Sequence, residues 1–400
     1  MTSRTSVIGA GISGLSAAYF LNGKAEIYEA SHEPGGRVKA ANIGNQWVDL
    51  GAQFIAKEDK HAMELVERLG MIKRLKAFDL KDFFFYKDGH KLDSKQLFKS
   101  IRSLFLFIRC MDEKKFARVH EEIAQFTLLD WYQQEFGGET GWLVDSMCRP
   151  ITFASSKELS AIFGIAIVAG YMNDCYSFEG GVNEIVTMLI KKAKPKLTFG
   201  LKATWLELGK NNRITLETRG KSSEQKTQGK ILSTIPAPEL AKIVGEKDLR
   251  RALNKIEYAG CGVVVFETDE KIFGEKLGVI FPGAEVAAAY DITSRFRGKT
   301  NLTEAIVVLV PFRSENKPDY QKLALKGLSE FDPDFKSKIK STTIVEWELG
   351  LPICSPKLFE IQERIREASP ENLLIAGDFM GLPSLDASIE TAYTCAKKLG

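Results

Sequence analysis

Short apolar runs separated by glycine-rich turns open the chain. Val7-Ile8 ends the first run, and residues 9–14 (Gly-Ala-Gly-Ile-Ser-Gly) follow it directly. Apolar positions at helical spacing continue through residues 15–21 until Asn22-Gly23, a pair typical of a helix C-terminus. A second short apolar run covers residues 25–28. The pattern predicts a strand, a glycine turn, a helix and a second strand within about thirty residues, a compact βαβ opening.

From residue 78 to residue 180 the pattern predicts mainly helices that are rich in aromatic side chains. In residues 95–109 the apolar positions share one helical face, and the basic positions lie largely off it. Amphipathic helices most often pack on a core, and we expect that here. The alternative is an interfacial helix that touches a membrane surface. No apolar run reaches the length of a membrane-spanning helix.

After residue 180 the pattern favours short strands again. Alternating or clustered apolar positions predict strands at 197–199, 206–208, 214–217, 231–235, 262–266, 279–281, 305–310 and 343–348. We interpret residues 221–226 as a polar hairpin tip. Residues 373–376 predict a buried strand that enters Gly377-Asp378, and residues 385–399 predict a closing helix.

The composition is that of an ordinary globular protein, with 44% hydrophobic and 27% charged residues. The net charge of +3 and the lack of a sustained basic face make nucleic acid an unexpected partner. The six cysteines are scattered without a C-x-x-C pair, and the four histidines have no metal-ligand spacing. We therefore expect no metal site and a cytoplasmic protein, with contact at the inner membrane face as the alternative that the amphipathic helix leaves open.

The turn at Gly9, Gly11 and Gly14 has the G-x-G-x-x-G spacing of a dinucleotide-binding loop. The first glycine permits a tight turn, the second lets the backbone approach a pyrophosphate, and the third lets the helix pack on the sheet. The helix N-terminus then presents N–H groups to the phosphates. Glu29, at the end of the second predicted strand, is placed to accept hydrogen bonds from the adenosine ribose.

The residues after Glu29 make the assignment more specific. The segment Gly35-Gly36-Arg37 completes a pattern of G-x-G-x-x-G, E and G-G-R with normal spacing. In these residues the chain resembles the FAD-dependent amine oxidase superfamily, which includes amine oxidases, protoporphyrinogen oxidase, carotenoid desaturases and renalase-like proteins. The resemblance implies non-covalently bound FAD. It also implies that Arg37 contacts the FAD diphosphate or lies under the flavin, which suits a guanidinium.

Further segments carry the same resemblance. Residues 47–54 look like the family's segment beside the flavin ring, and residues 374–378 with 383–390 are similar to its closing strand and helix. Residues 233–236 and Trp347 followed by Pro352 resemble two smaller motifs. Ala203 stands where the adenine-contacting strand usually has valine. The cofactor-binding residues that the resemblance implies are Gly9, Gly11, Ile12, Ser13, Gly14, Glu29, Ala30, Gly35, Gly36, Arg37, Gly51, Ala52, Gln53, Phe54, Ala203, Pro236, Trp347, Gly377, Asp378, Leu385 and Ser388.

Three residues are candidates to face the substrate: Gln53, Phe54 and Trp347. Many amine-oxidising members carry a lysine in the strand after residues 233–236, but residues 258–263 here contain none. No second G-x-G-x-x-G is present for a nicotinamide cofactor. We name no general base, and we expect catalysis by positioning of a neutral substrate beside the flavin.

We predict an α/β protein with a Rossmann-type FAD-binding domain, of the kind found in glutathione reductase, and a mixed α+β substrate domain. The FAD domain is predicted to combine residues 1–77, 185–250 and 365–400, and the substrate domain residues 78–184 and 251–364. The expected function is FAD-dependent oxidation of a C–N or C–C bond in a small, apolar or cyclic molecule. The alternatives are a renalase-like oxidase of dihydronicotinamides and a flavin-dependent isomerase or mutase without net redox. The oligomeric state is left open.

Overall fold

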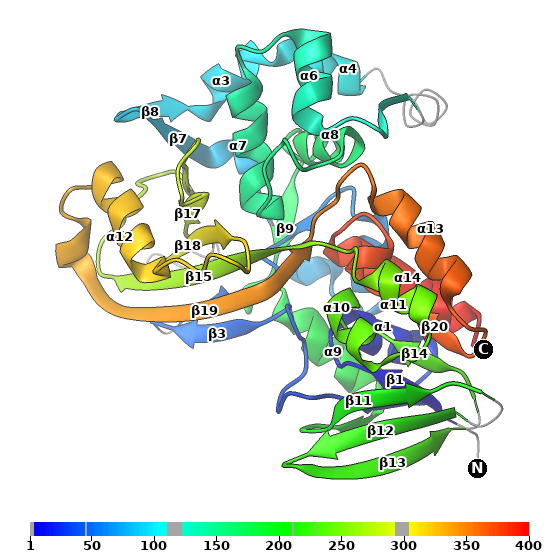
Figure 1. The fold of residues 1–400 in the computed structure, drawn as a ribbon. Helices are drawn as coiled ribbons and strands as arrows, with labels where there is room; N and C mark the ends of the chain where they lie inside the picture. Colours follow the sequence, from blue (N-terminus) through cyan, green and yellow to red (C-terminus); the bar gives the residue numbers. More distant parts are fainter. Residues whose placement is uncertain are drawn as a thin grey trace.

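The computed structural model describes residues 4–44, 46–109, 122–209, 212–227, 229–292 and 304–399. Within them, five parallel strands form a sheet in the order β10-β2-β1-β14-β20. These strands are β1 (Thr5–Ile8), β2 (Ala25–Tyr28), β10 (Lys196–Thr198), β14 (Ile231–Ser233) and β20 (Leu373–Ile375). All of them except the edge strand β10 are largely buried, since helices pack on the sheet, as is usual for parallel sheets. The predicted Rossmann-type core is confirmed, and its strands come from three separate parts of the chain (Figure 1).

Helices α1 (Ile12–Phe20), α9 (Asn183–Ala193) and α14 (Leu385–Lys397) pack with this sheet, together with α2 (Lys60–Arg68). Helix α1 ends where expected, because Asn22 and Gly23 adopt positive φ angles of 52° and 74°. The residue limits of the two predicted domains stay a prediction.

A three-stranded antiparallel sheet extends from this core at the bottom of Figure 1. It contains β11 (Lys202–Glu207), β12 (Asn212–Thr218) and β13 (Lys221–Thr227). The prediction of a hairpin tip at residues 221–226 is wrong, because these residues form the strand itself. Almost all of β13 is exposed, and its residues are polar. The strand therefore lacks the alternation of apolar and polar residues that would predict it.

The second large sheet has seven strands in the order β19-β15-β18-β17-β16-β7-β8. Its strands are β7 (Phe83–Lys87), β8 (His90–Asp93), β15 (Tyr258–Thr268), β16 (Gly278–Ile280), β17 (Ala288–Tyr290), β18 (Glu304–Phe312) and β19 (Ile339–Pro352). The central strands β15 and β18 are almost continuously buried, whereas the edge strand β19 mixes half-buried and exposed positions. Helix α12 (Tyr320–Phe331) covers part of this sheet (Figure 1).

A group of helices lies above this sheet in Figure 1. It contains α3 (Ser94–Ser100), α4 (Arg102–Arg109), α6 (Leu128–Phe136), α7 (Gly141–Thr152) and α8 (Ala161–Gly170). The amphipathic stretch packs as expected, since Ile101 and Leu104 are buried in the core, while Leu106 stays 48% exposed. The prediction of a mainly helical segment 78–180 needs correction at both ends. It begins with β7 and β8 and closes with β9 (Cys175–Ser177), because short apolar runs fit buried strands as well as helices.

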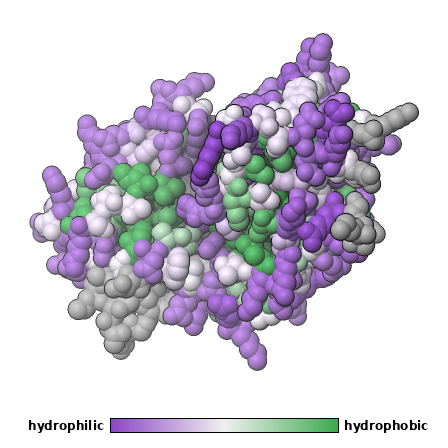
Figure 2. Space-filling view, turned by 90° about the horizontal axis from the view of Figure 1, so that it is seen from below, coloured by the Kyte–Doolittle hydropathy of each residue, from purple (hydrophilic) through white to green (hydrophobic). Residues whose placement is uncertain are grey.

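Smaller elements complete the fold. They are β3 (Ala40–Ile43), β4 (Gln46–Asp49), β5 (Ile55–Ala56), β6 (Lys76–Phe78), α10 (Ala237–Ile243), α11 (Lys247–Leu253) and α13 (Leu358–Ala368). Figure 2 shows hydrophilic side chains over most of the lower face, with apolar residues gathered in separate areas. Among the helices described, none has both the length and the apolar character to cross a membrane.

Candidate active site

The turn between β1 and α1 depends on its glycines for three different reasons. Gly9 has a φ of +99°, which side-chain-bearing residues rarely adopt. A Cβ on Gly14 would lie 2.0 Å from the carbonyl oxygen of Gly9, so only glycine lets α1 start against the turn. No described atom lies within 4 Å of a Cβ built on Gly11, and Gly11 caps α1 without a side-chain hydrogen bond. The turn therefore leaves open space where a pyrophosphate would meet the helix N-terminus.

The second glycine pair completes this cradle. Gly35 forms a parallel bridge with Gly11, and its N–H donates to the carbonyl oxygen of Ala10 at 2.8 Å. Gly36 has a φ of +56°, and a Cβ there would lie 3.4 Å from Cα of Gly11. Two glycine turns that are distant in the sequence therefore lie against each other. Their open backbone surface fits the diphosphate of FAD.

Glu29 lies at the end of β2, beside the turn. Its carboxylate accepts hydrogen bonds from the backbone N–H groups of Ala10, at 2.7 Å, and Ser31, at 2.8 Å. The neighbouring residue Ala30 is exposed. These bonds hold Glu29 next to the glycine cradle, where we predicted the ribose contact.

Arg37 connects the cofactor side of the molecule to the second sheet. Its guanidinium forms a two-point ion pair with Asp378, at 2.7 and 3.0 Å, and donates to the carbonyl oxygen of Gly350 on β19 at 3.1 Å. Burial opposes the charge of Arg37, but Asp378 and the nearby Tyr258 outweigh it and raise the pKa of the guanidinium above its ordinary value. A guanidinium has five N–H donors, so Arg37 can hold Asp378 and still contact an anionic cofactor.

The segment after β4 packs directly on Arg37. A Cβ on Gly51 would lie 1.8 Å from the Arg37 carbonyl oxygen, and the N–H of Ala52 donates to that oxygen at 3.0 Å. The indole N–H of Trp347 donates to the carbonyl oxygen of Leu50 at 2.5 Å. The need for glycine at position 51 thus comes from close packing on Arg37, which the sequence did not indicate. Trp347 holds this segment to β19.

The two other substrate-facing candidates behave differently. The Gln53 amide nitrogen donates to the carbonyl oxygens of Asp49 and Gly51, both at 3.0 Å. Phe54 packs edge-on against Phe78, with ring centroids 5.9 Å apart. Of the three candidates, the structure brings only Gln53 to the cavity described below.

The N-terminus of α14 is organised by its own side chains. The hydroxyl of Ser384 accepts from the N–H of Ala387 at 3.0 Å, and the hydroxyl of Ser388 donates to the Ser384 carbonyl oxygen at 3.1 Å. Asp386, in the first turn, accepts from the N–H of Ala62 on α2 at 2.7 Å. This acidic side chain is therefore directed to α2, while the helix end retains its partial positive charge.

The remaining predicted cofactor residues occupy defined places. Ile12 and Ser13 are buried in α1, and Ala203 is buried in β11. Pro236 caps α10, next to Ala237, whose N–H donates to the Tyr258 hydroxyl at 3.3 Å. Gly377 (φ +145°) directly precedes Asp378, and Leu385 begins α14.

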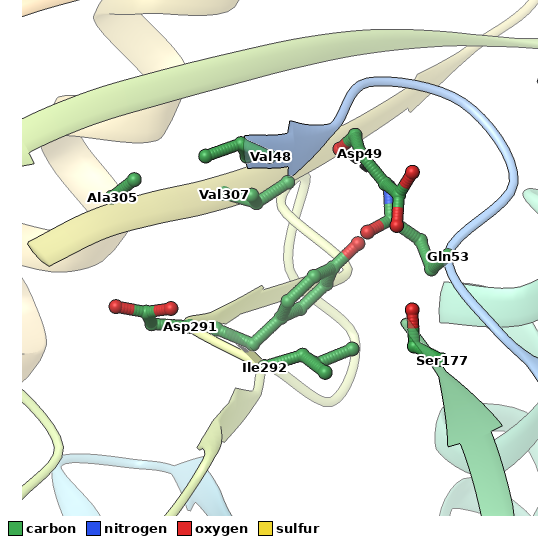
Figure 3. A pocket seen from close by; sticks show the side chains of 9 residues that line it. Val48, Asp49, Gln53, Ser177, Asp291, Ile292, Ala305 and Val307 are labelled. Carbon is green, nitrogen blue, oxygen red and sulfur yellow. Dashed lines mark hydrogen bonds between the residues drawn. The ribbon is translucent and has the colours of Figure 1, made fainter. Parts of the chain in front are cut away.

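A small cavity lies beside the segment after β4 (Figure 3). Its volume is about 10 Å³, which is room for about one water molecule. Figure 3 shows Asp49, Gln53 and Ser177 on one side of it, and Asp291 and Ala305 on the other. Its lining residues are Val48, Asp49, Gln53, Ser177, Tyr290, Asp291, Ile292, Ala305 and Val307.

Asp49 is the buried acid of this cavity. Its two carboxyl oxygens accept from the N–H of Val182, at 3.0 and 3.1 Å, at the start of α9. Burial raises the pKa of Asp49 to about 8, although the backbone N–H groups of Val182 and Asn183 oppose the shift. Asp49 is thus largely uncharged at neutral pH in the protein without substrate.

The sequence carries no signal for Ser177, Tyr290 and Asp291, because they belong to no motif. Within residues 258–263, aromatic rings pack directly against two glycines. A Cβ on Gly260 would lie 2.6 Å from Phe312, and a Cβ on Gly262 would lie 2.2 Å from Tyr320. Neither position has room for a lysine. The buried polar residues around the cavity come from β4, β9 and β17, and only folding brings them together.

Comparisons with known proteins agree with this geometry. The family model described as flavin containing amine oxidoreductase matches residues 12–347. The chain is 21% identical to an L-amino-acid oxidase from Sistrurus catenatus edwardsii, over 98% of this chain and 86% of that protein. A structure of a CLA-producing fatty acid isomerase from P. acnes covers 99% of this chain and 98% of its own, with 14% identity and a TM-score of 0.78. Cyclohexylamine oxidase from Brevibacterium oxydans IH-35A covers the same shares, with 14% identity and a TM-score of 0.73.

The two structural likenesses show the fold, and the family model spans most of the chain. The parallel sheet and the open glycine cradle agree with a dinucleotide cofactor such as FAD. The chain belongs to the flavin-containing amine oxidoreductase family and is an FAD-dependent oxidoreductase.

Proposed function

We propose that this enzyme oxidises a C–N bond of a small amine, and that the amino group binds in the small cavity lined by Asp49, Gln53 and Tyr290. The observation that carries the proposal is the chemistry of the lining. Among the described residues that line it, the titratable side chains are Asp49, Tyr290 and Asp291, and no lysine or arginine is present. Such a wall offers hydrogen-bonding groups to an amino group and no positively charged side chain to an anionic substrate.

The size of the cavity limits which part of a substrate can enter it. Its volume of about 10 Å³ has room for one group the size of a water molecule, such as an amino group. The side chains of Val48, Ile292 and Val307 form the apolar part of its lining. Because an amino group fits this space, we favour C–N over C–C oxidation. The relatives named for amino acid and cyclohexylamine oxidation agree with this choice.

The cofactor side of the proposal assigns FAD to the glycine cradle. Gly11 and Gly36 would leave space for the diphosphate, Glu29 would lie beside the ribose, and Arg37 would carry the positive charge nearest to the anionic groups. Bound FAD would accept the hydride that leaves the carbon next to the substrate nitrogen. Trp347 and Arg37 hold the segment at Leu50–Gly51 in place, and so they would fix the distance between cofactor and substrate.

The chemistry places one requirement on the substrate. Its nitrogen must be neutral when the hydride leaves, because its lone pair forms the new C=N bond. No lysine is available in residues 258–263 to assist, so we propose that the enzyme acts by positioning the neutral amine.

An anaerobic titration tests the proposal. The visible spectrum of the purified holoenzyme is recorded while small primary amines, dihydronicotinamides and porphyrinogens are added in separate experiments. We expect the flavin bands to bleach with a small amine. Bleaching only with a dihydronicotinamide or a porphyrinogen would replace the amine hypothesis by one of the other redox hypotheses. Bleaching only with dithionite would support the isomerase alternative, which the fold of the fatty acid isomerase also allows.

A further inference from the structure

Tyr290 has an unexplained buried hydroxyl. The residue ends β17 and is 5% exposed, and its hydroxyl has no hydrogen-bond partner in the part of the chain that the structure describes. A buried hydroxyl without a partner is costly. Native proteins contain few such groups, and each calls for an explanation, such as a functional role or a bound water or ion.

The ring of Tyr290 is held in place by its neighbours. In the sheet, Tyr290 pairs with Gly278 on one side and with Val307 on the other. A Cβ on Gly278 would lie 2.5 Å from Cβ of Tyr290, so the two strands pack closely at this point. The ring also contacts Phe83 edge-on, with centroids 6.2 Å apart. This packing restricts the ring and with it the position of the hydroxyl.

The hydroxyl belongs to the polar wall of the cavity. Tyr290 lines the cavity together with Asp49, whose carboxyl oxygens accept from the Val182 N–H, and Gln53, whose amide nitrogen donates to backbone carbonyl oxygens. Burial raises the pKa of Tyr290 well above its ordinary value, with a further contribution from Cys261 and Asp49. The phenol is therefore neutral, and its oxygen can accept a hydrogen bond. Since no described residue bonds to the Tyr290 hydroxyl, a bound molecule must supply its partner.

We propose that the Tyr290 hydroxyl is a substrate-binding group that accepts a hydrogen bond from the N–H of the substrate amine. This inference rests on the proposed function and names the residue that selects for nitrogen in that cavity. Tyr290 would act in binding and specificity, since no bond to it forms or breaks.

The variant Tyr290→Phe keeps the ring and removes the hydroxyl. We expect binding of a small primary amine, followed as a change in the flavin spectrum of the holoenzyme, to weaken about tenfold. Binding of the matched molecule with a methyl group in place of the amino group should not weaken. The melting temperature of the ligand-free variant should equal or exceed that of the unchanged protein, because an unpaired buried hydroxyl is gone.

Tyr320→Phe is the matched control. The Tyr320 hydroxyl donates to Glu346 at 3.1 Å, and Tyr320 does not line the cavity. This variant should bind the amine and the methyl analogue as the unchanged protein does. If Tyr290→Phe weakens both molecules equally, or neither, the assignment of Tyr290 is wrong, and its hydroxyl then serves packing or a bound water.

The measurements distinguish an error in the Tyr290 assignment from an error in the proposed function. If amines bleach the flavin of the unchanged protein but Tyr290→Phe does not discriminate between the two molecules, only the Tyr290 assignment fails. If no amine binds to the unchanged protein or bleaches its flavin, the proposed function fails, and the Tyr290 assignment fails with it.

Discussion

The glycine cradle and the cavity around Tyr290 are built in opposite ways. The cradle uses backbone atoms, and its glycines are needed because a Cβ would collide or because φ is positive. The cavity uses side chains from β4, β9 and β17, which are far apart in the sequence. A site made of backbone leaves a fixed pattern of glycines, whereas a site made of side chains can change residue by residue. The sequence therefore identifies the cofactor but does not identify the substrate.

The largest expected effect is at Gly14. Changing Gly14→Ala places a Cβ 2.0 Å from the Gly9 carbonyl oxygen, so the turn cannot keep its shape. We expect the purified variant to lack flavin absorbance and to lose about 3 kcal/mol of stability to denaturant. Gly11→Ala is the control, because no described atom lies within 4 Å of its Cβ. It should fold normally and bind FAD more weakly. A Gly14→Ala protein with full flavin content would contradict the backbone origin of the cradle.

The buried carboxyl group of Asp49, in the cavity, predicts that the stability of the protein depends on pH. The folded protein holds this proton more tightly than the unfolded chain, since burial raises the pKa from 3.8 to about 8. The resulting stability is complete below about pH 4 and is lost as the pH rises through about 8. Melting temperatures of the holoenzyme between pH 5 and pH 9 should fall less in Asp49→Asn. Asp59, whose pKa burial raises to about 7, leaves a residual decline in the variant. Identical pH profiles for both proteins would show that Asp49 is already charged at neutral pH.

Breaking the ion pair between Arg37 and Asp378 should lower the stability of the protein by an intermediate amount. In Asp378→Asn, Arg37 loses a two-point ion pair with a carboxylate that is only 5% exposed. We expect a loss of about 2 kcal/mol in urea unfolding, below the value for a fully buried pair because Arg37 is 30% exposed. Glu64→Gln removes an exposed pair with Arg68 and should cost under about 0.5 kcal/mol. Equal losses in the two variants would mean that burial does not strengthen the Arg37 pair.

The smallest effect is expected at Trp347. The variant Trp347→Phe keeps an aromatic ring but loses the hydrogen bond to the Leu50 carbonyl oxygen, worth about 1 kcal/mol. The segment beside the cavity should be held less firmly, so KM for the amine should rise several-fold while the flavin content stays the same. Trp47→Phe, at a 45% exposed position on β4, should leave KM unchanged. A loss of flavin in Trp347→Phe would instead assign this tryptophan to cofactor binding.

Several elements of the fold could not be predicted from the sequence patterns. Strand β13 was missed because it is polar along almost its whole length. Strand β17 was missed because its three buried residues, 288–290, form too short a run to distinguish from a loop. The helical segment 78–180 was extended over β7 and β9 for a related reason, since periodicity cannot separate short buried strands from helix turns.

By itself, the sequence determined the βαβ opening, the glycine cradle, the closing strand and helix, and hence the family and its cofactor. These features follow from local rules, because tight turns and positive φ angles admit few residues besides glycine. Only the tertiary structure decided that Arg37 pairs with Asp378, that Trp347 holds Leu50, and that Tyr290 ends inside a cavity with Asp49. Contacts between residues hundreds of positions apart depend on how the sheets and helices pack, and packing has no signature in a single run of residues.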